Sequence, residues 1–238
     1  MSIHLLTGAG SGIGRLLAER LHARGDDLVL IARDDDRAAE LAAAFPGATT
    51  VSADLAHPEQ IAPALAAAAL PARIDAVIHA AGVVALGPVA ELPLDAWTSQ
   101  LIVNLVAPAE LTRAVLPRVR AALRKIVFVN SGAGLTAHPD WGAYAASKHG
   151  LKALADALRG EEAAHGVRVT TVYPGRTATP MQAEVHAQEG SDYDPSRWID
   201  PASVVTAILT ALDLPRDAVI SDLSVRSEER RVGKECRS

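Results

Sequence analysis

The stretch IHLLTGAGSGIGRLLAERLHARG, residues 3–25, joins a short apolar run to a glycine-rich turn and then to a helical pattern. The apolar run at 3–7 predicts a strand, and the following pattern predicts a helix that stops at Gly25, as a C-terminal glycine cap does. Glycines in this setting let the backbone approach a pyrophosphate, whose charge is stabilised at the helix N-terminus. The stretch therefore favours a dinucleotide-binding fold, whereas a lone glycine-rich turn would indicate one only weakly.

The alternation of strand and helix continues to about residue 225. Apolar runs predict further strands at residues 27–33, 48–55, 73–82, 125–131, 166–175 and 217–223. Helical patterns cover residues 35–45, 61–70 and 95–120, a run from Tyr144 to about His165, and a segment that begins near Pro201. This alternation predicts an α/β protein: a single-domain Rossmann fold over residues 1–225, with a doubly wound seven-stranded parallel sheet and helices on both faces.

Composition supports a sizeable core and excludes several classes of partner. Hydrophobic residues make up 49% of the 238 residues, and the formal net charge is −5. That balance gives no footprint for nucleic acid or an anionic membrane. No apolar run approaches the ~20 residues that span a bilayer, and the N-terminus lacks a charged segment before a long apolar stretch. We therefore expect a soluble cytoplasmic protein.

The last residues, RSEERRVGKECRS at 226–238, carry no apolar periodicity. They resemble the translation of a common sequencing-adapter read, so we expect 226–238 to be an artefactual tail and the authentic C-terminus to be missing. A natural basic interaction tail is the alternative. Cys236, the single cysteine, lies in this tail, so the remaining chain can form neither a disulfide nor a thiolate metal site.

The ends of the predicted strands carry residues suited to a ligand site. In a doubly wound sheet, ligands bind beyond the carboxyl ends of the strands. The residues at these ends are Gly8, Arg33, Asp54, Gly82, Ser131 and Gly175. We expect them to converge on one crevice.

Arg33 follows the second predicted strand, where dinucleotide folds read the ribose. An acidic residue there suits a free 2′-hydroxyl, whereas arginine suits a 2′-phosphate, so Arg33 favours NADP(H) over NAD(H). Arg37 would assist from the next helix, while Asp34 to Asp36 place negative charge nearby. The alternative is a solvated arginine at a strand end.

Tyr144 and Lys148 lie four residues apart in an Ala-rich run, so on a helix they share one face. Alone, a phenol has a pKa of roughly 10 and a lysine roughly 10.4, so neither exchanges protons readily at neutral pH. A nearby positive charge lowers the pKa of a tyrosine, which makes the pair a candidate general acid/base. The alternative is an amphipathic residue beside a solvated charge, because the motif is short.

From residue 3 to about residue 225, the sequence resembles the short-chain dehydrogenase/reductases in their single-domain oxidoreductase form. The resemblance is carried by motifs in a specific order and spacing. They are Thr7-Gly8-x-x-x-Gly12-Ile13-Gly14, Asp54, Ala81-Gly82, Asn104, Ser131, Tyr144-x-x-Ser147-Lys148 and Pro174-Gly175 with Thr179. The resemblance implies a nicotinamide-dependent oxidoreductase acting on alcohols and on ketones or aldehydes.

The resemblance also implies roles for four catalytic residues. Tyr144 would exchange a proton with the substrate oxygen, and Ser131 would orient that oxygen. Lys148 would hold the ribose hydroxyls and lower the Tyr144 pKa, while Asn104 would position a water that continues the proton relay. Two hydroxyl donors aimed at a developing alkoxide would stabilise its charge. For Asn104 the alternative is a buried polar residue satisfied by the backbone.

Cofactor contacts are carried over in the same way. Asp54 would contact the adenine, the Gly82 backbone the adenine ribose, and residues 174–179 the nicotinamide carboxamide. The full expected set is Gly8, Ser11, Gly12, Ile13, Gly14, Arg33, Asp54, Leu55, Ala81, Gly82, Asn104, Tyr144, Lys148, Pro174, Gly175, Thr177 and Thr179.

Two positions depart from the family pattern. Where the family has Asn-Asn-Ala-Gly, this chain has His79 to Gly82, which removes an asparagine that commonly braces the fourth strand. We interpret His79 as a packed strand residue. Some NADP-using relatives carry a basic residue at the position of Ser11, so its absence leaves Arg33 as the main determinant of cofactor choice.

Substrate choice in this family lies mainly in the loop after the sixth strand, here residues 178–199. That loop contains Met181, His186, Tyr193 and Trp198, and Leu135 and Trp141 would line the other wall. The composition indicates a pocket for an apolar or aromatic carbonyl or alcohol, although aromatic residues could instead pack the lid shut. The expected substrate-binding residues are Ser131, Leu135, Trp141, Tyr144 and Met181.

No metal is expected, because the eight histidines show no ligand spacing. By resemblance we expect a homodimer or homotetramer built from the Asn104 and Tyr144 helices. The hypothesis is an NADP(H)-dependent oxidoreductase. The first alternative is a non-catalytic NADP(H)-binding regulator or scaffold. A sugar-nucleotide epimerase or dehydratase is disfavoured, because those relatives need a sizeable C-terminal domain that this chain lacks.

Overall fold

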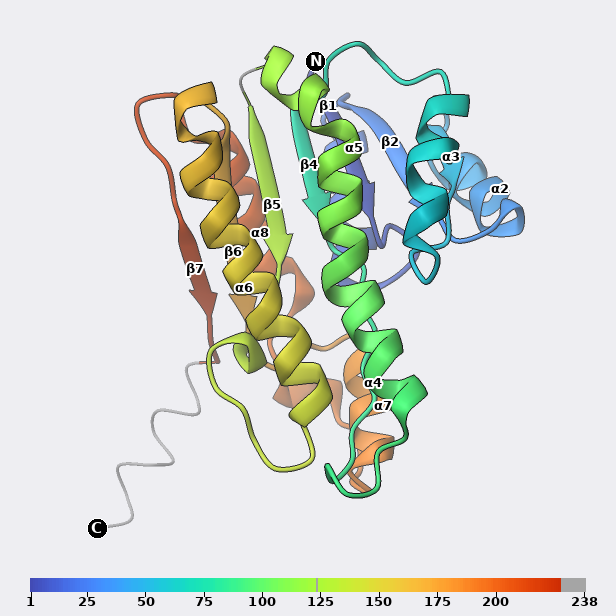
Figure 1. The fold of residues 1–238 in the computed structure, drawn as a ribbon, viewed down its shortest axis with the longest axis vertical. Helices are drawn as coiled ribbons and strands as arrows, with labels where there is room; N and C mark the ends of the chain where they lie inside the picture. Colours follow the sequence, from blue (N-terminus) through green and yellow to red (C-terminus); the bar gives the residue numbers. More distant parts are fainter. Residues whose placement is uncertain (123, 228–238) are drawn as a thin grey trace.

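The computed structural model describes residues 1–122 and 124–227. Seven parallel strands form one sheet in the order β3-β2-β1-β4-β5-β6-β7 (Figure 1). They are β1 (Ile3–Thr7), β2 (Asp27–Ala32), β3 (Thr49–Ser52), β4 (Ala76–His79), β5 (Lys125–Val129), β6 (Arg168–Pro174) and β7 (Asp222–Val225). The strand order reverses between β1 and β4, which is where doubly wound sheets bind their ligands. The predicted parallel sheet is confirmed.

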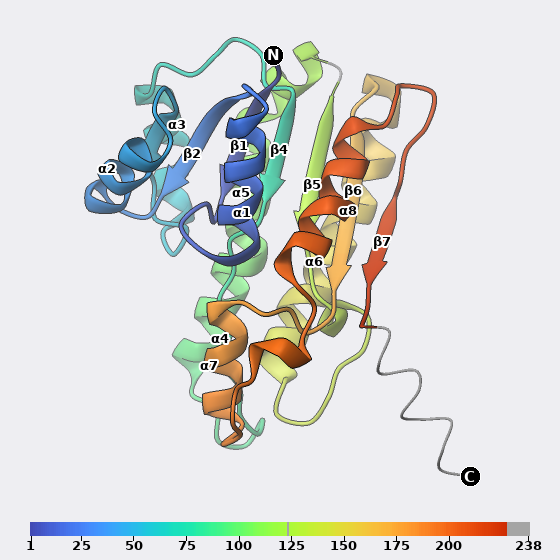
Figure 2. The ribbon, with the colours of Figure 1, turned by 180° about the vertical axis from the view of Figure 1, so that it is seen from behind.

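Helices cover both faces of the sheet (Figures 1 and 2). One face carries α3 (Ile61–Ala67), α5 (Ala107–Ala122) and α6 (Gly142–Glu162). The other carries α1 (Gly12–Ala23), α2 (Asp35–Ala44) and α8 (Pro201–Asp213). Two further helices, α4 (Leu94–Leu101) and α7 (Pro180–Gln188), lie beyond the carboxyl ends of the strands, at the bottom of Figure 1.

The core explains why the strands are nearly continuous apolar runs. Neighbouring side chains point to opposite faces, so Leu5 packs in one hydrophobic cluster and Leu6 in the other. All five residues of β5 are buried. Strands of a sheet covered on both faces are apolar on both sides, whereas strands of a sheet with one solvent-exposed face alternate apolar and polar residues.

Three segments differ from the sequence-based prediction. The single helix expected over 95–120 is divided by a π-helical turn at Ile102–Val106. The segment 178–199, expected as a loop, contains α7, whose first turn is capped by the Thr179 hydroxyl. The last strand begins at Asp222, later than expected. The predicted tail at 226–238 lies outside the described residues except for Arg226 and Ser227.

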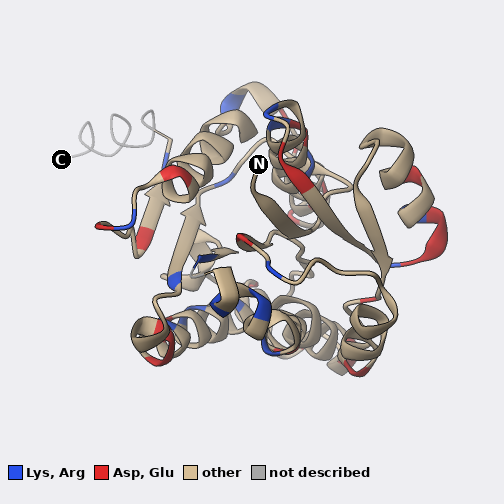
Figure 3. Cartoon of the chain, turned by 90° about the horizontal axis from the view of Figure 1, so that it is seen from above, with Lys and Arg blue, Asp and Glu red and all other residues tan. Residues whose placement is uncertain are grey.

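Charged residues of both signs are interspersed around the fold (Figure 3). Within residues 1–122 and 124–227, no helix combines the length and apolar character needed to cross a bilayer. The same part of the chain holds no group of three or more His, Cys, Asp or Glu side chains placed to bind a metal ion.

Candidate functional site

The glycine-rich turn after β1 is packed too tightly for side chains. Gly8 adopts φ +78°, and a Cβ there would lie 2.7 Å from the backbone nitrogen of Ala81. A Cβ on Gly14 would overlap the carbonyl oxygen of Gly8. The turn therefore brings β1, β4 and the start of α1 together as bare backbone, which is the cradle that a dinucleotide pyrophosphate requires.

The end of β4 is braced from β1. The Thr7 hydroxyl oxygen accepts hydrogen bonds of 3.1 Å from the backbone N–H groups of both Ala80 and Ala81. These bonds hold the β4 end without the asparagine that this chain lacks. His79 is buried, stacks on Phe128 at 4.8 Å and contacts the Thr112 hydroxyl at 2.9 Å. Burial lowers its pKa to about 3, so it is a neutral packing residue, as predicted.

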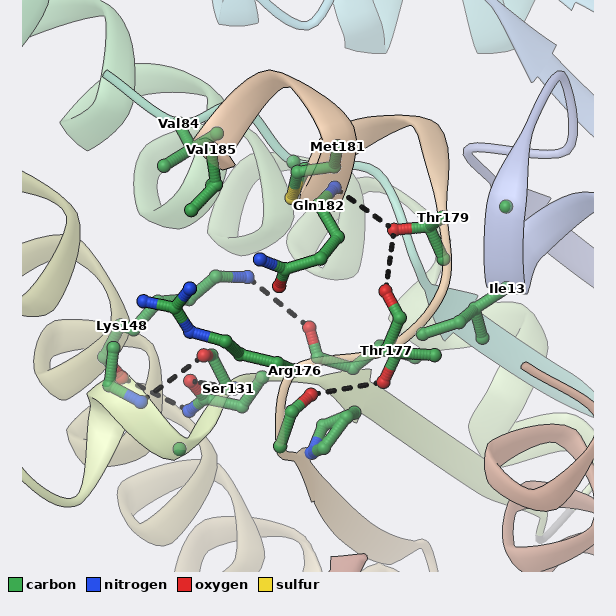
Figure 4. A pocket seen from close by; sticks show the side chains of 18 of the residues that line it. Ile13, Val84, Ser131, Lys148, Arg176, Thr177, Thr179, Met181, Gln182 and Val185 are labelled. Carbon is green, nitrogen blue, oxygen red and sulfur yellow. Dashed lines mark hydrogen bonds between the residues drawn. The ribbon is translucent and has the colours of Figure 1, made fainter. Parts of the chain in front are cut away.

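A cavity of about 740 Å³ opens at the carboxyl ends of the strands (Figure 4). Most of the predicted site residues line it. They are Gly8, Ser11, Gly12, Ile13, Gly14, Ala81, Gly82, Ser131, Trp141, Tyr144, Lys148, Pro174, Gly175, Thr177, Thr179 and Met181. The cavity wall does not include Arg33, Asp54, Leu55, Asn104 or Leu135.

Ser131 is held at the end of β5 by its neighbour Asn130. The Asn130 side-chain oxygen accepts from the Ser131 N–H at 2.8 Å, and its nitrogen donates to the Lys148 carbonyl at 3.0 Å. Asn130 therefore fixes Ser131 against the helix that carries Tyr144 and Lys148. The sequence-based prediction did not include Asn130, although its place beside Ser131 at a strand end was a signal.

Tyr144 is buried beside Ser131 in a cluster that includes Trp141. Burial raises the pKa of Tyr144, and a hydrogen bond with Ser131 opposes this only partly. Desolvation is the larger influence because it disfavours the phenolate, and the lowering of the Tyr144 pKa by Lys148 stays a prediction.

Lys148 is 4% exposed, and its ammonium donates to the Val129 carbonyl at 3.3 Å. The ammonium lies 5.8 Å from the centre of the Tyr144 ring. Burial lowers the Lys148 pKa to about 8. The predicted pairing of an ammonium with a phenol on one helix face is therefore present.

Asn104 lies in the π-helical turn and is 1% exposed. Its side chain accepts from the Val83 N–H and donates to the Val83 carbonyl, both at 2.9 Å, and it also donates to the Ser147 hydroxyl at 3.0 Å. This is the alternative arrangement, in which backbone groups satisfy a buried polar residue. The π-helical turn directs the Ala107 N–H to the Ile102 carbonyl. The water relay stays a prediction.

Arg33 and Asp54, which were expected to contact the ribose and the adenine, lie outside the cavity. Arg33 is exposed and its guanidinium donates to the Asp34 carboxylate at 2.8 Å, while Asp34 also caps α2. The Arg37 guanidinium lies against Gly10 of the glycine-rich turn, 3.5 Å from where a Cβ would be. Asp54 accepts from the Ala56 N–H at 2.9 Å.

The opposite end of the cavity is built around Arg176, which the sequence-based prediction missed. Its guanidinium lies 5.5 Å from the Trp141 ring and 5.4 Å from the Trp198 ring. Both terminal nitrogens donate to the carboxylate of Glu189, one of them at 2.7 Å. The contact between Arg176 and Trp141 joins residues 176–199, which we call the lid segment, to the start of α6. Further lining residues that were not predicted are Val84, Thr136, His138, Gln182 and Val185.

Comparison with known proteins agrees with this geometry. A family model described as short chain dehydrogenase matches residues 2–190. The dehydrogenase/reductase SDR family member 7B of Bos taurus is 33% identical over 240 residues, covering 93% of this chain and 74% of that protein. The 1-deoxy-11-beta-hydroxypentalenate dehydrogenase of Streptomyces exfoliatus is 35% identical, covering 93% of this chain and 83% of that protein.

The fold comparison gives the same result. A structure from Escherichia coli CFT073, assigned as a short chain dehydrogenase and complexed with NADPH, superposes with a TM-score of 0.83 and 27% identity. The match covers 95% of this chain and 97% of the other. With the family model spanning most of the sequence, the chain belongs to the short-chain dehydrogenase/reductase family of oxidoreductases.

Proposed function

We propose that this chain is an NADP(H)-dependent oxidoreductase that interconverts an alcohol and a ketone or aldehyde. The observation that carries the proposal is the placement of Ser131 and buried Tyr144 together at the wall of the cavity, with the Lys148 ammonium 5.8 Å from the Tyr144 ring. Two hydroxyl groups that converge on one point suit an oxygen that gains and loses negative charge.

The residues present fit a nicotinamide dinucleotide. The backbone cradle at Gly8 and Gly14 excludes any Cβ, as close approach of a pyrophosphate demands. Pro174 to Thr179 would hold the nicotinamide end, and Lys148 the adjoining ribose. The bound nicotinamide supplies or accepts the hydride. The chain supplies position and proton transfer.

Tyr144 supplies the proton in the reductive direction. Because burial raises its pKa, the phenol is protonated at neutral pH and donates from its hydroxyl to the substrate oxygen. Ser131 donates a second hydrogen bond to the same oxygen and so orients it. In the oxidative direction the tyrosine must first lose its proton, which the raised pKa disfavours. We therefore expect reduction to be the faster direction at neutral pH.

The preference for NADP(H) rests on Arg33 and Arg37. Arg33 directly follows β2, and the Arg37 guanidinium lies against the glycine-rich turn and pairs with Glu40. Asp34 uses its carboxylate to cap α2 and to hold Arg33, so it need not repel a phosphate. Arg33→Ala should weaken NADPH binding about tenfold and leave NADH binding unchanged. Equal losses for both cofactors would contradict this assignment.

The test is consumption of NADPH and NADH by the full chain over a panel of aldehydes, ketones and quinones, with Tyr144→Phe as the blank. We expect turnover that favours NADPH and falls at least a hundredfold in the variant, while the NADPH Kd stays within twofold. Tight NADPH binding without any Tyr144-dependent turnover would instead support the non-catalytic regulator.

We also propose that the chain forms a homo-oligomer through α5 and α6. Small side chains lie exposed along α6 at Ala146, Ala153 and Ala157, and Val106, which directly precedes α5, is 45% exposed. Such a flat, partly apolar surface suits a second copy. Light scattering should give a dimeric or tetrameric mass, and Ala153→Arg should shift it toward the monomer. A monomeric wild-type mass would contradict the proposal.

A further inference from the structure

Gln182 on α7 is a buried polar residue whose side chain reaches into the cavity from the lid (Figure 4). It is 6% exposed. The structure places its amide nitrogen 2.9 Å from Nδ1 of His186. The other end makes no hydrogen bond to the described residues, and Gln182 lines the cavity. A half-satisfied buried amide that faces a cavity indicates a polar group on the ligand.

His186 decides which end of the amide faces the cavity. Its Nδ1 also lies 2.8 Å from the backbone carbonyl oxygen of Gln182. A deprotonated Nδ1 would set its lone pair against that carbonyl, whereas an Nδ1–H donates to it. An Nδ1–H in turn requires an acceptor at the second contact. Both contacts are attractive only when the amide oxygen and nitrogen exchange places, so that the oxygen faces His186 and the nitrogen faces the cavity.

The imidazole is held in this orientation. His186 is 4% exposed and its ring packs edge-on against Tyr193 at 5.3 Å and against Trp198 at 5.1 Å. The aromatic packing fixes the plane of the ring, and the 2.8 Å contact of Nδ1 with the Gln182 carbonyl fixes which edge faces Gln182. His186 is therefore a positioning residue for the amide.

The surroundings favour an electron-rich ligand group. The described residues that line the cavity include no Asp or Glu, while Lys148 contributes positive charge, as do Arg226 from the predicted tail and Arg176, which is paired with Glu189. An amide N–H₂ in such a wall is a donor that seeks an acceptor oxygen. A substrate with an apolar remainder would leave this donor buried and unpaired, which costs binding free energy.

We infer that Gln182 is a specificity-determining residue that selects substrates with a second acceptor oxygen, such as a carbonyl or carboxylate, apart from the reacting carbonyl. This inference rests on the proposed reductase function. Ser131 and Tyr144 hold the reacting oxygen, and the Gln182 amide donates to the second one.

The test compares cyclohexanone with 1,2- and 1,4-cyclohexanedione, and 2-alkanones with keto acids of equal chain length. Wild-type kcat/KM, corrected for two equivalent carbonyls, should favour the acceptor-bearing member about five- to tenfold, the effect of one hydrogen bond. Gln182→Leu should remove that preference through KM and leave cyclohexanone turnover and the NADPH Kd within twofold. Gln182→Glu, which lacks the donor, should disfavour the keto acids.

Two further variants separate recognition from folding. Gln60→Leu, the same change at an exposed position outside the cavity, should leave every ratio unchanged. His186→Phe should lower the preference partly, because the amide can then rotate. An unchanged ratio in Gln182→Leu, equal loss on cyclohexanone, or a weakened NADPH Kd would each overturn the inference, the last by placing the amide against the cofactor.

A measurement of ligand binding tests the role of Gln182 separately from any measurement of turnover. Saturation-transfer NMR on NADP⁺-loaded wild type and Gln182→Leu would measure the Kd of each ketone pair. A binding preference that disappears in the variant, without turnover by the wild type, would support the role of Gln182 in specificity and refute the proposed reductase function. Turnover with no such binding preference would support the reductase function and refute the role of Gln182 in specificity. Failure of both measurements would refute both.

Discussion

The turn between β1 and α1 and the lid segment at 176–199 enclose opposite ends of the same cavity by different means. The turn is made of backbone, with Gly8 and Gly14 packed so closely that no side chain fits. The lid is made of side chains, with Arg176 held between two tryptophans and Glu189. The first arrangement tolerates almost no change of sequence, whereas the second can be rebuilt residue by residue.

This difference separates the residues that indicate the family from the residues that determine substrate specificity. A backbone cradle recognises what all dinucleotides share, so the residues that form it indicate the family. A wall of side chains recognises what differs between substrates, so it is specific to this chain. Four predictions test this difference between the turn and the lid segment, in order from the largest expected effect to the smallest.

Gly14→Ala should have the largest effect. The added methyl group would overlap the Gly8 carbonyl, so the turn must move and NADPH affinity should fall at least a hundredfold. Gly160→Ala is the matched control, because a Cβ there meets nothing within 4 Å and α6 gains helix propensity of up to about 1 kcal/mol. Fluorescence titration and thermal unfolding measure both. Normal NADPH binding by Gly14→Ala would show that the cradle is adaptable.

The pH dependence of NADPH binding should come next. Because the Lys148 pKa is about 8, the ammonium is charged below that pH and loses its proton above it. If the charged form binds the cofactor, the NADPH Kd should rise about tenfold from pH 7 to pH 9. Lys148→Met should bind weakly at both pH values with a flat profile. A flat wild-type profile would show that the Lys148 charge does not contribute.

Arg176→Met should have a smaller effect, confined to the lid. Loss of the ion pair and of the contacts with Trp141 and Trp198 loosens the segment, so KM for carbonyl substrates should rise about fivefold. The NADPH Kd should stay within twofold, because the cradle is untouched. Glu189→Gln, which keeps the shape but removes the charge, should give an intermediate KM. A large change in NADPH Kd would show that the two ends are coupled.

His79→Leu should have the smallest effect at neutral pH, since this side chain belongs to neither end. His79 is neutral in the folded chain because burial lowers its pKa to about 3, while the unfolded chain binds a proton near pH 6.5. Its contribution to stability is thus complete above about pH 6.5 and is lost as the pH falls toward 3. Wild type should lose about 1 kcal/mol per pH unit more than the variant between pH 6 and 4, measured by urea unfolding.

Much of the site could be predicted because its residues occupy the ends of strands. Spacing placed Tyr144 and Lys148 on one helix face, whereas the family resemblance grouped them with Ser131, which lies just beyond β5. The shift of the Tyr144 pKa could not be predicted, because its direction depends on burial, and a sequence motif does not show how buried a residue is. Gln182 and Arg176 were missed because a lone polar residue in an expected loop gives no signal until α7 and the tryptophans surround it.

The sequence by itself determined the parallel sheet, the glycine cradle and the Tyr144 helix, since each follows from local periodicity and from the conformations that its residues allow. Only the tertiary structure decided that Asn104 satisfies the Val83 backbone, that burial raises the Tyr144 pKa and that Gln182 lines the cavity. The physical reason is that local geometry depends on neighbours in sequence. Desolvation and the pairing of polar groups depend on neighbours in space, which folding alone supplies.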